Sequence, residues 1–527
     1  MMKMVFTVIL MVVFFAAMIG VGLYCRKHST DVNGFVLGGR SVGPWLTAFA
    51  YGTSYFSAVI FVGYAGQFGW NFGMASTWIG LGNAFIGSLL PWVILGRRTR
   101  VMTQHLESKT MPDFFGKRYD SDGLKIFASV IVFIFLIPYT SSLYNGLSSL
   151  FNIAFDIPYW VVIAVMAVLT CAYVIFGGYM ATAINDFIQG VIMLVGIVAV
   201  IAAVIADNGG FINAYNELSI IDAGNGMNGG FASFLGPDPL FLFFVVMLTS
   251  LGTWGLPQMV GKFYSIKNEE SIKKGTIIST IFAIIVAGGC YFLGGFGRLY
   301  GDVVTRTESG GVLFDSVVPA MLKALDNEII VGIVIVLVLA ASMSTLSSLV
   351  LTSASTLALD FIAPKCKKEM SEKTKLVTLR VLIVFFVIIS AVIAILKDAF
   401  PGFTFIAQLM GVSWGALAGA FLAPFLYGLY WKKVTKPAVA VSFVWGSVMS
   451  IVQLLVTLGV ITMPAGFLAD CMFKTSLHSG VFAMVGGLIL VPAVSLLTPK
   501  MNKDTVDGMF KCYDKDVTVP FTQNLGK

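Results

Sequence analysis

The chain has 527 residues, of which 57% are hydrophobic and only 12% are charged, and its formal net charge is +7. A typical soluble chain has about 25% charged residues, so this one lacks the polar side chains that would cover a soluble core of its size, and a soluble enzyme is excluded. Disordered and fibrous chains are excluded as well, because both are poor in large apolar residues.

Thirteen apolar stretches are long enough to cross a membrane as helices. The hydrocarbon layer is about 30 Å thick and needs about 20 helical residues, and only helices or closed barrels satisfy their backbone within it. The predicted spans cover residues 4–24, 44–69, 73–96, 123–150, 158–176, 182–206, 237–258, 274–297, 328–360, 376–396, 402–430, 437–461 and 478–497. We therefore expect an all-α, multi-pass membrane protein.

Basic residues are distributed unevenly around these spans. The first span is too long for a secretory signal, lacks an A-x-A cleavage site and is followed by Arg26 and Lys27. With the N-terminus outside, the inner loops include 97–122 and 259–273, and they hold most of the basic residues, Lys262 among them. The positive-inside rule thus predicts an outside N-terminus and an inside C-terminus. The positive charge is mainly an orientation signal, and no nucleic-acid partner is inferred.

Two spans contain residues that weaken a helix in mid-membrane. They are Ala50–Ser57 (AYGTSYFS) in the second span and Ser250–Pro257 (SLGTWGLP) in the seventh. Glycine costs about 1 kcal/mol and proline about 3 kcal/mol inside a helix, and unwound backbone at membrane depth must line a cavity or bind a ligand. Two interruptions at a five-helix offset indicate a transporter with inverted repeats. Close helix packing through small residues is the alternative.

Hydroxyl side chains gather on one face of the ninth span. Ala341, Ser344, Thr345 and Ser348 share this face by their spacing of three and four residues. Hard cations such as Na⁺ prefer oxygen ligands, and hydroxyls with free carbonyls supply them with little net charge. Hydrogen bonding of these hydroxyls to their own helix is the alternative.

Asp186 is an acidic residue near or within the sixth span, where an ionisable group is by default a functional hypothesis. A solvated carboxylate at the inner end of that span is the alternative. Trp254 and Tyr139 either contact a substrate or belong to the core. The six cysteines are scattered singly and the three histidines lack a partner at ligand spacing, so neither a disulfide framework nor a metal-hydrolase centre is predicted.

Three motifs resemble those of the sodium:solute symporter family. They are Gly38–Ser41 (GGRS) before the second span, Phe176–Tyr179 (FGGY) with Asp186–Gly190 (DFIQG) around the sixth, and Ala341–Ser348 (ASMSTLSS) in the ninth. The resemblance extends to about residue 500. It implies a leucine-transporter-type core of two inverted five-helix repeats, flanked by one helix before and two after.

The implied organisation has six parts. They are an extra N-terminal helix with a cytoplasmic linker (1–43), the first repeat (44–206), an extracellular loop (207–236), the second repeat (237–430), two additional helices (431–499) and a mobile cytoplasmic tail (500–527).

The resemblance also implies ion sites. A sodium site between the second and ninth spans would use the backbone carbonyls of Thr53, Phe56 and Ala341 and the hydroxyls of Ser344 and Thr345. Family members with a second sodium use an aspartate on the sixth span and serines on the ninth. The corresponding residues here are Asp186, Ser347 and Ser348.

A solute pocket is implied by position. Its residues would be Tyr55, Ser57, Tyr139, Trp254 and Gln258. Proline carriers of the family have an aspartate at the position of Tyr55 and a tryptophan at the position aligned with Thr249, so the residues here depart from the proline pattern.

The sequence thus predicts a sodium-coupled symporter of the cell membrane, not an enzyme, which imports a small polar organic solute by alternating access. The solute classes are amino acids, carboxylates or vitamins, and sugar-like compounds. Na⁺ is the only metal expected, and no obligate protein partner is inferred beside the solute and the lipid bilayer. A proton-coupled transporter of the same fold is the alternative, followed by an uncoupled channel and a membrane-embedded enzyme.

Overall fold

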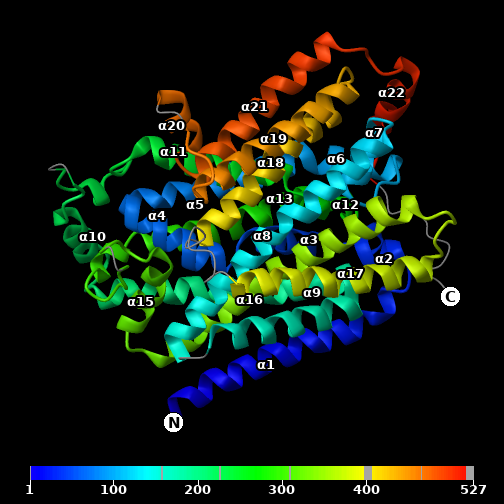
Figure 1. The fold of residues 1–527 in the computed structure, drawn as a ribbon. Coiled ribbons are helices and arrows are strands. Elements are labelled where there is room, and N and C mark those ends of the chain that lie inside the picture. The colour runs from blue at the N-terminus through cyan, green and yellow to red at the C-terminus, as the bar shows by residue number, and fades with distance from the viewer. Residues whose placement is uncertain are drawn as a thin grey trace.

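The computed structural model describes residues 2–155, 158–224, 227–307, 310–396, 406–463, 466–514 and 516–517. Their regular structure is helical throughout, and the helices form an elongated bundle (Figure 1). The beginning of the predicted span 402–430 and the end of the tail beyond residue 517 lie outside the described residues.

Among the described residues, ten helices are long and apolar enough to cross a membrane, or eleven if a bent pair counts as one span. The ten are α1 (Met2–Cys25), the run Val59–His105, α8 (Asp122–Phe155), α9 (Tyr159–Asp207), the run Glu269–Gly294, the run Glu328–Lys365 that begins with α16 (Glu328–Thr356), α17 (Glu372–Ile395), α18 (Ile406–Tyr430), α19 (Lys436–Thr457) and α21 (Ser476–Leu497).

Two of these helical runs are too long for one crossing, and each contains a glycine that breaks it. The 49 residues of α9 would make a straight helix of roughly 74 Å, more than twice the hydrocarbon thickness of about 30 Å. Gly178 in α9 has φ 56° and ψ −149°, a backbone conformation that residues other than glycine rarely adopt. Gly73 has a similar conformation, φ 58° and ψ −135°, within the run Val59–His105. The predicted boundaries between spans coincide with these two glycines.

The two interruptions predicted from glycine, hydroxyl and proline residues are confirmed. Helix α3 (Pro44–Tyr55) ends at Phe56, which is extended with φ −86° and ψ 119°. Helix α11 (Pro239–Leu251) passes through a short turn to Leu256, with φ −84° and ψ 120°, where α12 (Pro257–Tyr264) begins. The helices on either side of Leu256 differ in direction by 45°.

Helices α18 and α16 form the centre of the bundle. In their most apolar stretches 94% and 78% of the residues are buried, against 33% for the peripheral α17. Gly190 in α9 allows α3 to approach this centre, because a Cβ there would lie 2.3 Å from Phe49 Cδ1 and 3.1 Å from Thr53 Cγ2. The glycine of the Asp186–Gly190 motif therefore sets how closely the interrupted helix packs.

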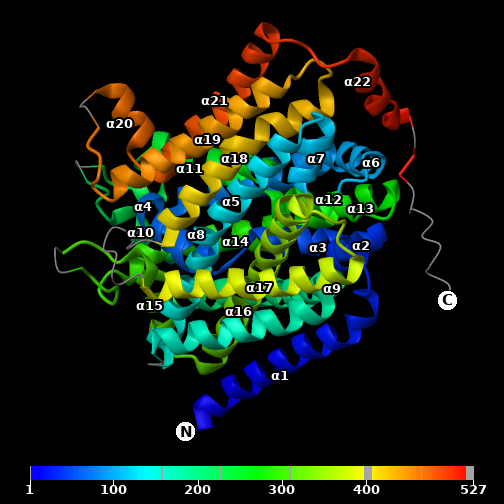
Figure 2. The same cartoon turned by 45° about the vertical axis from the view of Figure 1, so that its right-hand side comes forward.

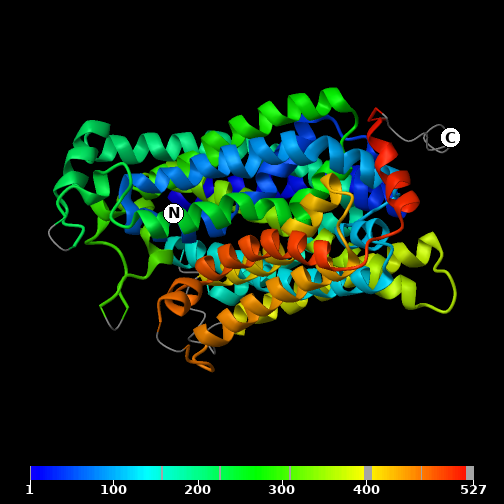
Figure 3. The same ribbon diagram turned by 90° about the horizontal axis from the view of Figure 1, so that it is seen from above.

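The two ends of the bundle carry different elements. Helix α1 begins at the end that carries α10 (Phe211–Ile220) and α15 (Val317–Ala324), whereas α6 (Arg97–His105), α7 (Met111–Arg118) and α22 (Lys503–Phe510) lie at the other (Figures 1 and 2). The view from above shows α22 at the end opposite the α10 region (Figure 3).

The described part of the C-terminal tail is docked on the bundle, which differs from the expected mobile extension. Asp507 in α22 accepts a hydrogen bond from Lys432 at 2.7 Å, and the Tyr513 hydroxyl donates to the Leu429 carbonyl at 2.9 Å. The residues after Pro499 thus make contacts with the bundle that the composition of the tail does not predict.

Candidate functional site

The hydroxyl face of α16 meets the broken end of α3. Ser344 Oγ donates to the Thr53 carbonyl at 3.1 Å, and Thr345 Oγ1 lies 3.1 Å from the same carbonyl and 3.3 Å from that of Phe56. The two hydroxyls also lie 3.0 and 3.2 Å from the Ala341 carbonyl. The structure therefore brings together all five oxygens that the family resemblance implied for one sodium site.

The break in α3 explains why a carbonyl is available there. In a continuous helix the Phe56 carbonyl would accept from the N–H of Ile60. Here the N–H groups of Ile60 and Phe61 both donate to the Ser57 carbonyl, at 3.0 Å each. The Phe56 carbonyl is thereby left to the hydroxyl of Thr345.

The chemistry of this cluster suits a hard monovalent cation. Its ligands are neutral carbonyl and hydroxyl oxygens, and the residues that supply them are buried. A further oxygen, Thr53 Oγ1, is buried without a hydrogen-bond partner among the described residues. Buried polar atoms are normally satisfied, so this orphaned oxygen fits a site that takes an additional ligand.

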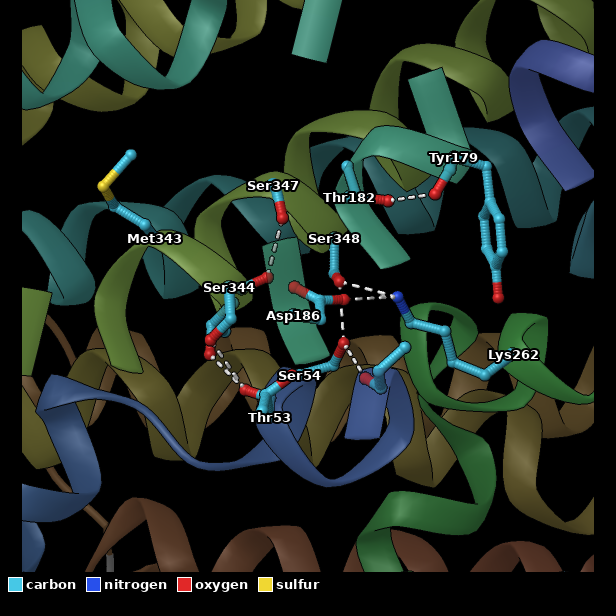
Figure 4. Close-up of polar contacts among 12 residues, drawn as sticks. Thr53, Ser54, Tyr179, Thr182, Asp186, Lys262, Met343, Ser344, Ser347 and Ser348 are labelled. Carbon is cyan, nitrogen blue, oxygen red and sulfur yellow. Dashed lines mark hydrogen bonds and ion pairs between the residues drawn. The ribbon is translucent and has the colours of Figure 1, made fainter. Parts of the chain in front are cut away.

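A second polar group lies beside the first, around Asp186. The side chain of Asp186 is fully buried, which rules out a solvated carboxylate at the membrane surface. Its Oδ2 lies 3.5 Å from Nζ of Lys262 in α12, and this ammonium donates to Ser348 Oγ at 2.9 Å. Ser347 instead donates to the Ser344 carbonyl at 2.9 Å. Figure 4 shows the Lys262 ammonium facing both Asp186 and Ser348.

Lys262 is the residue of this group that sequence reasoning missed. Lys262 belongs to the predicted inner loop 259–273, but in the structure α12 extends through this residue and its side chain is 4% exposed. Pro257 is the signal that was available, because proline favours the first turn of a new helix. The lysine lies one turn and a half inside that helix.

Three of the five expected solute residues lie together around Trp414 in α18. The rings of Tyr55 and Tyr139 lie 5.7 Å and 6.0 Å from the Trp414 ring, and the Tyr139 side chain also contacts that of Ser57. The hydroxyls of Tyr55, Ser57 and Tyr139 and the indole Nε1 of Trp414 are buried and make no well-aligned hydrogen bond among the described residues, although the Tyr139 hydroxyl lies close to Ser57 and Trp414. Such a set of unsatisfied donors and acceptors suits a polar ligand.

The other two expected solute residues lie elsewhere. Trp254 donates its Nε1–H to the Ile86 carbonyl at 2.8 Å, so its polar atom is used in helix packing. Gln258 lines a small cavity of about 50 Å³ with Lys262, Ser348 and Tyr179, and its amide atoms have no partner in the described part of the chain. Of the two alternatives for Trp254, the structure favours a core aromatic.

Arg40, from the first motif, ties together the end of the bundle where α6 and α12 finish. Its guanidinium donates to the carbonyls of Thr103 at 3.2 Å, Ser108 at 2.6 Å and Tyr264 at 3.1 Å. Burial lowers the pKa of Arg40 to about 10, so the side chain stays charged at neutral pH. The end of α12, and with it Lys262, is held by this arginine.

The comparisons with known proteins all identify transporters. The model of the sodium:solute symporter family matches residues 35–446. The osmoregulated proline transporter OpuE of Bacillus subtilis is 28% identical over 516 residues, 95% of this chain and 96% of the relative. Sodium/proline symporter 2 of Staphylococcus saprophyticus is 30% identical over 455 residues, 85% of each chain.

Among solved structures, a Na⁺-coupled sialic acid symporter in a substrate-bound outward-open state matches with a TM-score of 0.72. The sequences are 15% identical, and the match covers 94% of this chain and 99% of the other. At that identity the likeness concerns the fold alone.

Proposed function

Because the chain belongs to the sodium:solute symporter family, we propose that it couples the entry of sodium to the import of a small polar organic solute. The family is one of multi-pass membrane transporters and not of enzymes. One observation carries the proposal, namely the five buried neutral oxygens of Thr53, Phe56, Ala341, Ser344 and Thr345 at the break in α3.

These oxygens would hold the sodium ion between two segments that are not neighbours in the chain. A bound ion links the carbonyls of α3 to the hydroxyls of α16, and so stabilises one arrangement of the two helices. Each sodium that moves inward down a potential of 100 mV supplies about 2.3 kcal/mol. A neutral site also releases the ion readily, because no fixed negative charge traps it.

The solute site shares a stretch of backbone with the ion site. Tyr55 and Ser57, whose side chains approach Tyr139 and Trp414, flank Phe56, whose carbonyl belongs to the oxygen cluster. A solute held by Tyr55 and Ser57 would fix the conformation of Phe56 that sodium also needs. Each ligand then favours binding of the other, because such coupling is reciprocal.

We propose thirteen membrane crossings with the N-terminus outside and the C-terminus inside. The count follows if α9 is split at Gly178, the run Val59–His105 is split at Gly73, and each broken helix makes one crossing. The end that carries α6, α7 and α22 would be cytoplasmic, as its basic residues favour. The two sets of five helices that start with α3 and α11 would be inverted repeats, which rock around the shared site.

The proposed solute is a small polar molecule of the amino acid, carboxylate or sugar-like classes. Because two relatives are named as proline transporters, proline-like amino acids are the first solutes to test. Tyr55 and Thr249, however, differ from the residues that proline carriers of the family have at these positions. The side chains of Tyr55, Ser57, Tyr139 and Trp414 are neutral. They can form hydrogen bonds with a solute, but none of them carries a charge that could pair with a charged group of the solute.

Purified protein in proteoliposomes provides the test. We expect an inward sodium gradient to drive uptake of a solute found by thermal-shift screening, with stabilisation that requires both ligands. Uptake driven by a pH gradient without sodium would indicate the proton-coupled alternative. Flux that follows the solute gradient and ignores sodium would indicate a channel and overturn the proposal.

A further inference from the structure

A lysine of the chain itself lies where the sequence suggested a second sodium ion. We propose that the ammonium of Lys262 replaces that ion, so that the transporter binds a single sodium per cycle. This inference rests on the proposed function and adds its ion stoichiometry.

The contacts of Lys262 are those expected of a bound cation. Its Nζ lies 3.5 Å from Asp186 Oδ2 and 2.9 Å from Ser348 Oγ, and Ser348 Oγ in turn lies 2.7 Å from Ser54 Oγ. On its other side Nζ lies 5.3 Å from the centre of the Tyr179 ring (Figure 4). Oxygens from α9 and α16 thus contact an ammonium that α12 supplies, and Ser54 of α3 hydrogen-bonds to one of these oxygens, Ser348 Oγ.

Charge balance argues against a further ion at this place. The side chains of Asp186 and Lys262 are 0% and 4% exposed, so both are shielded from bulk water. One carboxylate and one ammonium neutralise each other. A sodium ion added beside them would introduce an unbalanced positive charge in a buried volume and would have to displace Nζ from Ser348.

The position of Lys262 also distinguishes it from an exchangeable ion. Lys262 and Ser54 belong to the two broken helices, whereas Asp186 and Ser348 belong to the helices against which these pack. When the broken helices rock, as proposed above, the contacts between these pairs open and re-form. A sodium ion would leave into the cell at that step, but the lysine stays attached and returns with the empty transporter.

The test is to count bound sodium with ²²Na⁺ alone on the purified full-length protein, which needs no knowledge of the solute. We expect the wild type to bind one ion per chain without cooperativity. Lys262→Ser leaves Asp186 without its partner and should bind two ions. The double variant Lys262→Ser/Asp186→Asn removes both charges and should return to one.

Three further variants keep the result interpretable. Lys267→Ser removes an exposed lysine from the turn after α12 and should leave one ion bound. Thr345→Ala alone should weaken sodium binding by about tenfold or more, whereas Lys262→Ser/Thr345→Ala should still bind one ion tightly in the position that Lys262 vacates. Folding of each variant is checked by gel filtration and thermal unfolding.

Two bound ions in the wild type overturn the inference, whatever Lys262→Ser does, and so does a folded Lys262→Ser protein that still binds one. Absence of sodium binding in the wild type overturns the proposed function instead. The wild-type count alone decides the question if Lys262→Ser fails to fold.

Discussion

The hydroxyl of Thr345 lies 3.1 Å from the carbonyl of Thr53, although 292 residues separate them in the chain. The contact exists because α3 stops at Tyr55 and because α16 turns its hydroxyl face toward that end. In the proposed transporter this pair forms the central part of the sodium site.

Thr345→Ala removes one of the two hydroxyls of that site. We expect the sodium concentration for half-maximal uptake to rise by about tenfold or more, because a lost ligand of about 1.4 kcal/mol corresponds to that factor. Thr345→Ser keeps the hydroxyl and should stay near wild type. Ser342→Ala is the matched control, since in the described part of the chain Ser342 donates only to Val338 of its own helix, at 2.8 Å. Unchanged sodium dependence in Thr345→Ala would refute the site.

Tyr55→Phe removes a buried hydroxyl that has no partner among the described residues. The melting temperature should therefore stay the same or rise slightly, while the KM for the solute increases. Tyr51→Phe, one turn earlier, should show the opposite pattern. Its hydroxyl donates to the Gly87 carbonyl at 2.8 Å, so its loss should cost about 1 kcal/mol of stability. A loss of stability without an effect on KM in Tyr55→Phe would exclude Tyr55 from the solute site.

Gly69→Ala tests the close packing of the second half of the interrupted helix. A Cβ at Gly69 would lie 1.9 Å from the Gly294 carbonyl oxygen, so the two backbones must separate. We expect a loss of about 2 kcal/mol, measured by thermal unfolding in detergent. Gly20→Ala is the control, because a Cβ there meets nothing within 4 Å. Equal melting temperatures for the two variants would contradict the packing described here.

Trp254→Phe separates a packing role from a solute role. It removes the hydrogen bond to the Ile86 carbonyl and keeps most of the aromatic volume. We expect a loss of about 1 kcal/mol of stability with the solute KM unchanged within a factor of about two. A large rise in the solute KM at unchanged stability would show instead that Trp254 takes part in solute binding.

Several features of this protein follow from the sequence without the tertiary structure. The apolar runs predict the membrane spans, and the glycine and proline residues near Phe56 and Leu256 predict where two helices break. All of these depend on local energetics, namely the length of an apolar stretch and the cost of a residue within a helix, which a short window of sequence contains.

The partners of individual side chains were decided by the tertiary structure. Lys262 lies three residues after the start of the predicted inner loop 259–273, and its sequence neighbours resemble those of any solvated basic residue. In the structure, however, α12 packs Lys262 against Asp186 and Ser348. Trp254 and Tyr139 were equivalent by composition, and only the positions of Ile86 and Trp414 distinguish them. Such contacts depend on how helices from distant parts of the chain rotate and cross, and no local pattern contains that information.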